Sequence, residues 1–219
     1  LAGSGWHCRY GTGASMSQIT SGVRAILSHP AVYDQFQMLM GSDRIRRELV
    51  SKHIRPFAGM RLLDIGCGTA RILDYLPQLS YHGFDLSHKY IDEAVARYAD
   101  RGVFRCALVE EATLQGEPPF DLVLAVGVLH HLDDKSTQQL MQLAKFALKD
   151  GGRLVTIDPC YDSKQNPIAR FLVSQDRGQN VRSGEHYRQL ALNAFSQIDG
   201  VVRHRAWIPY THWIMECTK

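Results

Sequence analysis

The residues best suited to chemistry lie in one short stretch near residue 65. An apolar run at 62–65 contains Asp64 and is followed by Gly66, Cys67 and Gly68. The run reads as a strand buried on both faces, and it stops abruptly at two glycines spaced one residue apart. Glycine allows positive φ and a close approach of the backbone, so the amides that follow can face a bound ligand at the start of a helix. This spacing predicts a ligand-binding turn after a buried strand.

The glycine pattern is shorter than that of a dinucleotide-binding loop. Arg71 occupies the position of the third glycine in G-x-G-x-x-G, so a pyrophosphate would be crowded. The run 62–69, Leu-Leu-Asp-Ile-Gly-Cys-Gly-Thr, closely resembles the first motif of class I S-adenosylmethionine-dependent methyltransferases, whose ligand carries no phosphate. The resemblance implies an α/β fold with a Rossmann-like seven-stranded, mostly parallel sheet, helices on both faces and an antiparallel C-terminal hairpin. It also implies S-adenosylmethionine as cofactor, with S-adenosylhomocysteine as its product. The cofactor-binding candidates in this motif are Asp64, Gly66, Cys67 and Gly68.

Acidic residues follow the next two predicted strands. Asp85 ends the strand 81–85 about 20 positions past the glycines, where a carboxylate can accept both hydroxyls of a ribose. The alternative is a carboxylate that stabilises the next helix N-terminus. If Asp85 binds the ribose, Leu86 would lie against the adenine ring. By the resemblance, an acid after the third strand bonds the adenine amino group, and Glu110 is favoured over Glu111 for this contact.

A second motif lies at 120–132, where the sequence resembles the family's fourth motif. Its apolar core predicts a parallel strand that ends at Val126, whose carboxyl end would meet the donor. His130 and His131 follow, placed as general bases for a substrate hydroxyl or amine, because imidazole titrates near neutrality. Packing or capping of the next helix is the alternative for both histidines.

Two segments outside these motifs are expected to contact the substrate. Helical residues at 16–58 would cover the site, and the polar segment 159–185 is long enough to act as a substrate lid. Arginines suit bidentate capture of a carboxylate or phosphate, which indicates an acceptor with an acidic group, although surface solvation is an equal alternative. The substrate candidates are Tyr33, Tyr161, Arg177 and Arg182.

The hydrophobic periodicity predicts alternating helices and strands around these motifs. Helices are predicted at 70–76, 87–99, 134–148 and 183–194, and strands at 61–65, 81–85, 103–108, 122–126, 153–158, 201–207 and 210–217. Residues 16–219 are interpreted as one domain, and residues 1–15, which lack periodicity, as a vector-derived tail foreign to the natural protein.

Composition narrows the function classes. The chain has 219 residues and a formal net charge of +3, which favours a small-molecule substrate over nucleic acid. Its five cysteines are scattered without metal-ligand spacing, so no metal site is predicted and a cytoplasmic location with reduced thiols is expected. No apolar run reaches the ~20 residues of a membrane span. A monomer or homodimer is expected.

The sequence therefore predicts transfer of a methyl group from S-adenosylmethionine to an oxygen or nitrogen of a small molecule. A nicotinamide-dependent oxidoreductase is one alternative, favoured by the order of strand, glycines and acid but opposed by Arg71. A non-catalytic S-adenosylmethionine-binding protein is another, since no residue is chemically indispensable. A nucleic-acid methyltransferase is disfavoured by the charge.

Overall fold

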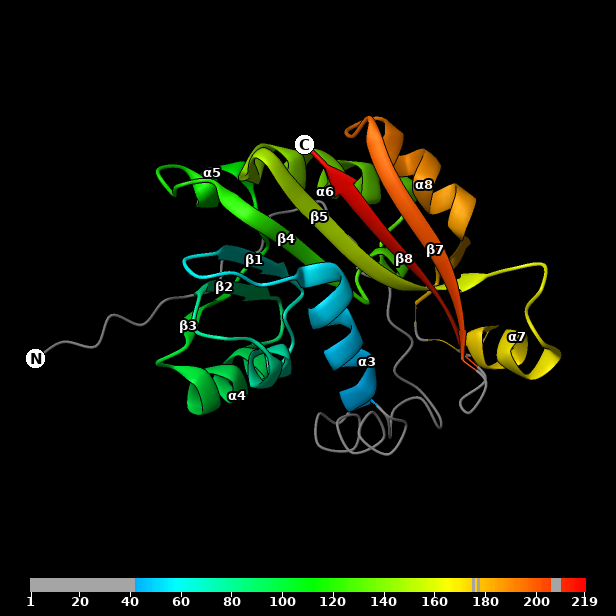
Figure 1. The fold of residues 1–219 in the computed structure, drawn as a ribbon, viewed down its shortest axis with the longest axis horizontal. Coiled ribbons are helices and arrows are strands. Elements are labelled where there is room, and N and C mark those ends of the chain that lie inside the picture. The colour runs from blue at the N-terminus through cyan, green and yellow to red at the C-terminus, as the bar shows by residue number, and fades with distance from the viewer. Residues whose placement is uncertain (1–41, 175, 177, 206–209) are drawn as a thin grey trace, which may run out of the picture.

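The computed structural model describes residues 42–174, 176, 178–205 and 210–219. Seven strands form a continuous sheet in the order β3-β2-β1-β4-β5-β8-β7, and a short β6 pairs with β5 off this path (Figure 1). The strands are β1 (Arg61–Ile65), β2 (Ser80–Asp85), β3 (Gly102–Cys106), β4 (Phe120–Val126), β5 (Leu148–Tyr161), β6 (Arg182–Ser183), β7 (Gln197–Arg205) and β8 (Tyr210–Thr218). The first five strands of the path pair in parallel, whereas β8 is antiparallel to both β5 and β7. The predicted parallel sheet with antiparallel C-terminal strands is confirmed.

Helices cover both faces of the sheet (Figure 1). The α-helices are α3 (Ser42–Glu48), α4 (His88–Tyr98), α5 (Glu111–Leu114), α6 (Asp134–Ala147), α7 (Pro167–Ser174) and α8 (Gly184–Leu192). Shorter segments are the π-helical η1 (Leu49–Ile54) and the 3-10 helices η2 (Arg71–Tyr75) and η3 (Leu129–His131). Apolar residues of α6 and α8 pack on one face, and those of η1, η2 and α4 pack on the other.

The predicted helices begin where side chains can cap them. Ser87 accepts a hydrogen bond from the Tyr90 amide at the start of α4, and Asp133 accepts one from the Ser136 amide at the start of α6. These caps satisfy amide groups that have no partner within the helix. The helix predicted at 70–76 is instead a 3-10 helix, because Ala70 is left-handed at φ 53° and Leu76 is already extended before the proline at position 77.

A charged cluster attaches the segment before β1 to the sheet. Glu216 on β8 pairs with Nδ1 of His53 at 2.6 Å, with Arg55 at 2.7 Å and with Arg153 at 2.9 Å. Arg153 also donates to the backbone carbonyls of His53 and Ile54. The end of η1 is therefore held against β5 and β8 by hydrogen bonds that join three elements.

Candidate functional site

Two glycines adopt left-handed conformations in the turn after β1. The φ angle is 74° at Gly66 and 55° at Gly68, a region that L side chains rarely adopt. The amides of Gly66 and Cys67 donate to the carbonyl of Phe84 at 2.8 and 3.0 Å, which holds the turn against the end of β2. A Cβ at Gly66 would lie 2.6 Å from Val128, whereas a Cβ at Gly68 would meet no heavy atom within 4 Å. The turn is therefore packed at Gly66 and open at Gly68.

Asp85 joins the end of β2 to this turn. One carboxylate oxygen accepts a hydrogen bond from the Gly68 amide at 3.0 Å, and the other accepts one from the Ser87 amide at 2.8 Å. Burial raises the pKa of Asp85, and hydrogen bonds from the backbone amides of Ser87, Gly68 and Leu86 partly offset that rise. The sequence-predicted acid and the sequence-predicted glycine turn thus meet at the carboxyl ends of adjacent strands.

Asp64 and Cys67 lie on the inner side of the turn. The side chain of Asp64 is buried and accepts a hydrogen bond from the Tyr81 hydroxyl at 2.6 Å. Burial raises its pKa to about 7, with the hydrogen bond from Tyr81 opposing and the charge of Asp85 adding to that shift. The thiol of Cys67 packs 2.9 Å from where a Cβ on Gly83 would be. The carboxyl of Asp64 is therefore held within the sheet by Tyr81, and a cofactor-binding role for Asp64 stays a prediction.

Apolar side chains are exposed where the neighbouring strands end. Leu86 after β2 is 43% exposed, Leu108 after β3 is 42% exposed, and Val126 at the end of β4 is 39% exposed. The carboxyl ends of parallel strands share one edge of the sheet, and ligands of open α/β sheets bind outside that edge. Leu108 is absent from the sequence-predicted site residues, although its position just after a strand is a usable signal.

Glu110 and Glu111 lie at the start of α5 on the same edge. Both side chains are exposed. The backbone of Glu110 is fixed by Thr113, whose Oγ1 accepts from the Glu110 amide at 3.0 Å and donates to its carbonyl at 2.7 Å. The backbone of Glu110 is thus fixed after β3, and contact of either carboxylate with adenine stays a prediction.

His130 is bonded to a carboxylate on each side of its ring. Nδ1 lies 2.8 Å from Asp158 at the end of β5, and Nε2 lies 3.2 Å from Asp176 beyond α7. Asp176 also accepts from the Tyr210 hydroxyl, and the Asn180 amide donates to the His130 carbonyl at 3.0 Å. Burial alone would lower the pKa of His130, but the two carboxylates outweigh it and raise the pKa to about 9.

The prediction that His130 acts as a general base is corrected by this geometry. Its ring is buried, both nitrogens are engaged by carboxylates, and the imidazole carries its proton at neutral pH. A base must have a free lone pair within reach of the substrate proton. The His131 ring lies 4.0 Å from that of His130 between centroids and is also buried, so a catalytic role for His131 stays a prediction.

The Arg182 side chain is buried and makes its hydrogen bonds within the protein, so it does not face a substrate. Its guanidinium donates to the carbonyls of Leu129 and Leu132, which flank η3, and to the carboxylate of Asp134 at the start of α6. It donates further to the carbonyl of Asn180, and only 6% of the residue is exposed. Nε, Nη1 and Nη2 thus make four hydrogen bonds within the protein, and Nη2 also lies 2.8 Å from the Asp134 carboxylate. The prediction that Arg182 binds an acidic substrate is therefore corrected.

A cavity of about 390 Å³ opens beside the end of β5. Sequence-predicted Tyr161 lines it, together with Asp176, and its remaining walls come from α7 and the chain that follows. The lining residues are Tyr161, Val173, Ser174, Asp176, Gly178, Gln179 and Val181. Every lining residue of this cavity therefore belongs to the segment 159–185, whose role as a substrate lid stays a prediction.

The remaining sequence predictions concern two substrate residues, a metal site and a membrane span. Tyr33 and Arg177 lie outside the described residues. Within the described ranges, no three His, Cys, Asp or Glu side chains group so as to hold a metal ion. In the same part of the chain, no helix combines the length and apolar character that a membrane span needs. The pairing of Asp176 with His130 is not among the sequence predictions, because nothing local in the sequence indicates that these two residues meet.

Comparison with known proteins agrees with this architecture. A family described as "Methyltransferase domain" matches residues 63–154. A ubiquinone biosynthesis O-methyltransferase of Caulobacter sp. (strain K31) is 32% identical over 105 residues, covering 46% of this chain and 41% of the relative. An O-methyltransferase of Penicillium expansum is 32% identical over 158 residues, covering 64% of this chain and 55% of the relative. The chain thus spans less than two thirds of the length of these curated relatives.

Solved structures show the same fold at low sequence identity. The S-adenosylmethionine-dependent methyltransferase SibL superposes with a TM-score of 0.65 at 15% identity, covering 94% of this chain and 63% of SibL. The matched domain begins within β1 and ends within β5, so it contains the glycine turn, Asp85 and the edge at Val126. Residues 63–154 are thus similar to a methyltransferase domain, and the strand order and the likeness to SibL show that the chain has the fold of S-adenosylmethionine-dependent methyltransferases.

Proposed function

We propose that this chain transfers a methyl group from S-adenosylmethionine to an oxygen of a small-molecule acceptor. The observation that carries the proposal is the contact between Asp85 and the open side of the glycine turn at Gly68. The first relatives are named as O-methyltransferases, which supports oxygen over nitrogen as the atom methylated. The bound cofactor supplies an electrophilic methyl group, so the protein has mainly to align the acceptor and exclude water.

The residues at the strand edge fit the parts of this donor. The Asp85 carboxylate is only half-buried, so it is available to accept hydrogen bonds from ribose hydroxyls. The exposed side chains of Leu86, Leu108 and Val126 offer apolar surface for the adenine ring, and Glu110 can accept from its amino group. The open face at Gly68 leaves room for the amino-acid portion. Gly66 and Cys67 shape the turn through their backbone.

We assign the acceptor to the cavity lined by Tyr161. Tyr161 offers a hydroxyl and Gln179 an amide for orienting a polar acceptor, while Val173 and Val181 supply apolar wall. His130 lies near both regions, since its ring is 3.7 Å from where a Cβ on Gly127 would be and 3.2 Å from Asp176, which lines the cavity. The proposed acceptor cavity and the end of β4 therefore both adjoin one histidine.

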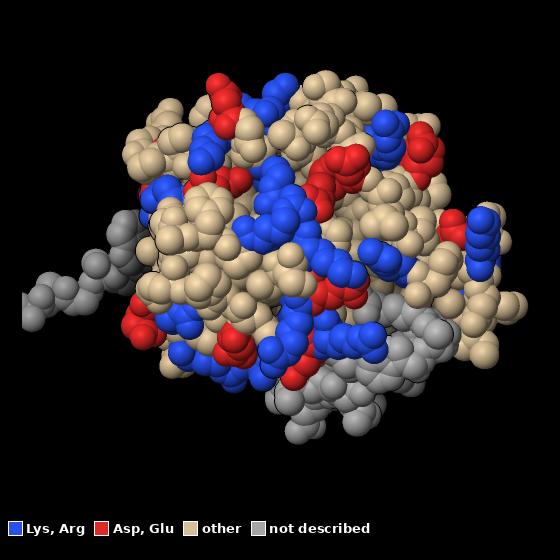
Figure 2. Space-filling view, viewed as in Figure 1, with Lys and Arg blue, Asp and Glu red and all other residues tan. Residues whose placement is uncertain are grey.

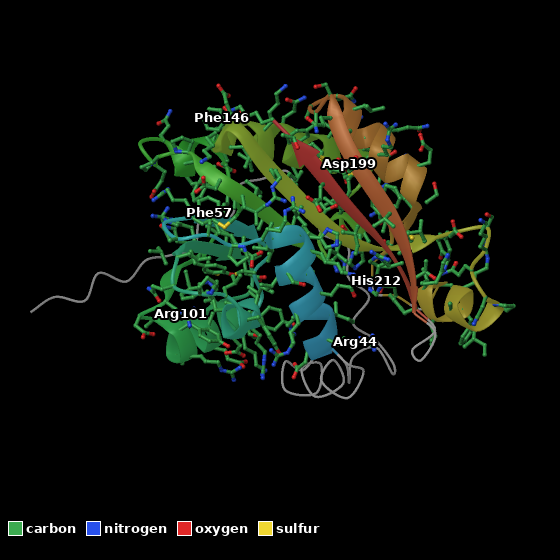
Figure 3. All side chains as sticks on the ribbon, in the orientation of Figure 1. Arg44, Phe57, Arg101, Phe146, Asp199 and His212 are labelled. Carbon is green, nitrogen blue, oxygen red and sulfur yellow. The ribbon has the colours of Figure 1, made fainter. Side chains whose placement is uncertain are left out.

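Cationic side chains suited to an acidic group also line a cavity before β1. A second cavity of about 590 Å³ lies between α3 and η2, and its lining includes Arg44, Arg47, Lys52 and Tyr75. Figure 2 shows Lys and Arg side chains in a band over this face, and Figure 3 shows Arg44 near the start of α3. Lys52 is paired with Glu48 at 3.0 Å, which leaves the two arginines as the cations suited to an anion.

The other expectations are kept as proposals. The chain is proposed to act as one domain at 16–219, with 1–15 as a vector-derived tail, 16–58 as an N-terminal cover and 159–185 as the substrate lid. Four cysteines in the described residues are free thiols, which supports the expected cytoplasmic location. A monomer or homodimer is proposed, with no nucleic-acid or membrane partner. The oxidoreductase and non-catalytic alternatives are not favoured, because the matched relatives are methyltransferases.

Two measurements test the activity. Isothermal titration with S-adenosylmethionine and, separately, with NADH should give binding for the first compound only. Release of S-adenosylhomocysteine should then be followed over a panel of phenols, alcohols and amines, half of them carrying a carboxylate. We expect turnover with hydroxyl compounds. Binding of S-adenosylmethionine without turnover of any acceptor would favour a non-catalytic binding protein, and no binding at all would overturn the proposal.

A further inference from the structure

His130 contacts both the end of β4 and the segment that follows α7. It belongs to η3, directly after the end of β4, where the donor edge lies. Its ring reaches Asp176, and its carbonyl accepts from the Asn180 amide. Gly178 lies against the same ring, since a Cβ at this glycine would come within 2.1 Å of the His130 ring. The segment that forms one wall of the acceptor cavity is therefore packed on this single side chain.

The contact between His130 and Asp176 is ionic, and further hydrogen bonds hold the residue at each end of it. Asp158 lies under His130 with 1% exposure, and the backbone amide of His130 donates to the same carboxylate oxygen that Nδ1 contacts. On the other side, Asp176 accepts from His130, from the Gly178 amide at 2.9 Å and from the Tyr210 hydroxyl. A protonated imidazole donates from both nitrogens at once, whereas the neutral ring can donate from only one. The bridge is complete only while the ring is charged.

We propose that His130 is a positioning residue for the acceptor, a cationic link that fastens Asp176 and the segment 178–181 over the cavity beside the donor edge. This inference rests on the proposed function for the meaning of the cavity, but the link itself does not depend on it. The role is distinct from general-base catalysis, because the proton stays on the imidazole throughout. Methyl transfer needs alignment of acceptor and donor, and a wall fixed in place by His130 would contribute to it.

The surroundings of His130 give the link a defined response to pH. The titratable and charged groups around it are Asp158 on β5, Asp176 after α7, His131 on η3, Arg182 on β6, Tyr187 on α8 and Tyr210 on β8. His130 has a folded-state pKa of about 9, above its ordinary 6.5, so the link is fully present below 6.5 and is lost as pH rises through about 9. Loss of the proton would leave two carboxylates facing a neutral ring.

Hydrogen exchange tests the link without any acceptor. In the wild-type protein, protection of amides in 178–181 should fall as pH rises through about 9, after correction for intrinsic exchange rates, while β8 stays protected. In His130→Gln, exchange of 178–181 should already be at least about 10-fold faster at pH 7. His186→Gln, which removes an exposed histidine–carboxylate pair with Asp134, is the matched control and should match wild type.

A second variant keeps the test valid if His130→Gln does not fold. Asp176→Asn changes the other end of the link at a side chain that is 17% exposed, and it should give the same faster exchange. The double variant should lose less protection than the sum of the two single variants, because both single variants remove the same contact between His130 and Asp176. Wild-type protection of 178–181 in Asp176→Asn, or equal loss of protection in β8 and 178–181 at high pH, would overturn the link.

Kinetics separate positioning from base catalysis. Once an acceptor has been identified, Asp176→Asn should raise the KM for that acceptor by about 10-fold or more. The affinity of this variant for S-adenosylmethionine should change by less than about twofold. A fall in kcat alone for His130→Gln, with exchange of 178–181 unchanged, would assign the histidine to catalysis and contradict positioning. If no acceptor is turned over, the proposed function fails, while the exchange experiment still decides whether the link exists.

Discussion

The carboxylate of Asp85 accepts a hydrogen bond from the Gly68 amide at 3.0 Å, so the acid that ends β2 is attached directly to the turn that follows β1. The two residues are 17 positions apart in the sequence, and parallel pairing of β1 with β2 brings them together. This contact fixes the spacing between the group proposed to hold ribose and the backbone proposed to face the amino-acid portion of the donor.

Removing the charge of Asp85 should weaken donor binding. We expect Asp85→Asn to raise the dissociation constant for S-adenosylmethionine by about 10-fold or more, because two charge-assisted hydrogen bonds to ribose are weakened. Asp92→Asn, an exposed acid on α4, is the control and should bind as wild type does. Isothermal titration measures both variants. Unchanged affinity in Asp85→Asn, with its fold intact by circular dichroism, would remove this residue from the site.

The two glycines of the turn should respond differently to substitution. Gly66→Ala places a Cβ 2.6 Å from Val128 at φ 74°, so we expect a loss of unfolding free energy of about 2–4 kcal/mol. Gly68→Ala meets open space, so only the left-handed strain of about 1 kcal/mol should appear. Urea unfolding gives both values. A larger loss for Gly68→Ala than for Gly66→Ala would contradict the packing described for this turn.

The buried carboxyl of Asp64 should make stability depend on pH. Its pKa is raised from 3.8 to about 7 by burial, so the folded state binds a proton more tightly and unfolding free energy falls as pH rises through this window. Asp64→Asn keeps an acceptor for Tyr81 and cannot ionise. We expect this variant to be more stable than wild type by about 1–3 kcal/mol at pH 8 and to lack the decline. A parallel pH dependence in both proteins, measured by urea unfolding, would be evidence against a buried Asp64.

We expect Arg182 to stabilise the folded protein and not to bind the substrate. Replacing it by lysine removes most of the contacts to Leu129, Leu132 and Asp134, so we expect a loss of about 2–4 kcal/mol of unfolding free energy. Affinity for S-adenosylmethionine should stay near wild type in protein that remains folded at low temperature. An increase in acceptor KM with stability unchanged would instead support the substrate role that the sequence predicts.

The charged cluster at Glu216 should anchor the segment before β1. Glu216→Gln leaves Arg153, Arg55 and His53 without their carboxylate, and we expect a loss of about 1–3 kcal/mol, discounted because the cluster is partly exposed. Burial would raise the pKa of Glu216, but Arg55 and His53 outweigh it and lower the pKa below 4.5, so this contribution should disappear in acid. Glu93→Gln, which removes an exposed pair with Arg97, should cost less than about 0.5 kcal/mol. Thermal or urea unfolding measures both, and equal losses would disprove the anchor.

The sheet, the glycine turn and the position of Asp85 could be predicted from the amino-acid sequence alone. Buried parallel strands are continuous apolar runs, and the residues after them fall at one edge, so 62–65 and 122–126 identified both the fold and the donor edge. The starts of the helices at Ser87 and Asp133 could also be predicted from nearby residues, since a capping side chain bonds an amide only a few residues away.

The partners of His130, Arg182 and Asp64 could not be predicted from the sequence and became visible in the folded chain. Each of these polar side chains is buried, and a buried polar group takes its role from whichever partners the fold brings to it. For His130 those partners are Asp158 and Asp176, which reach it from β5 and from beyond α7. Residue type and spacing predicted a base and an anion-binding arginine, whereas packing made one a charged link and the other an internal support.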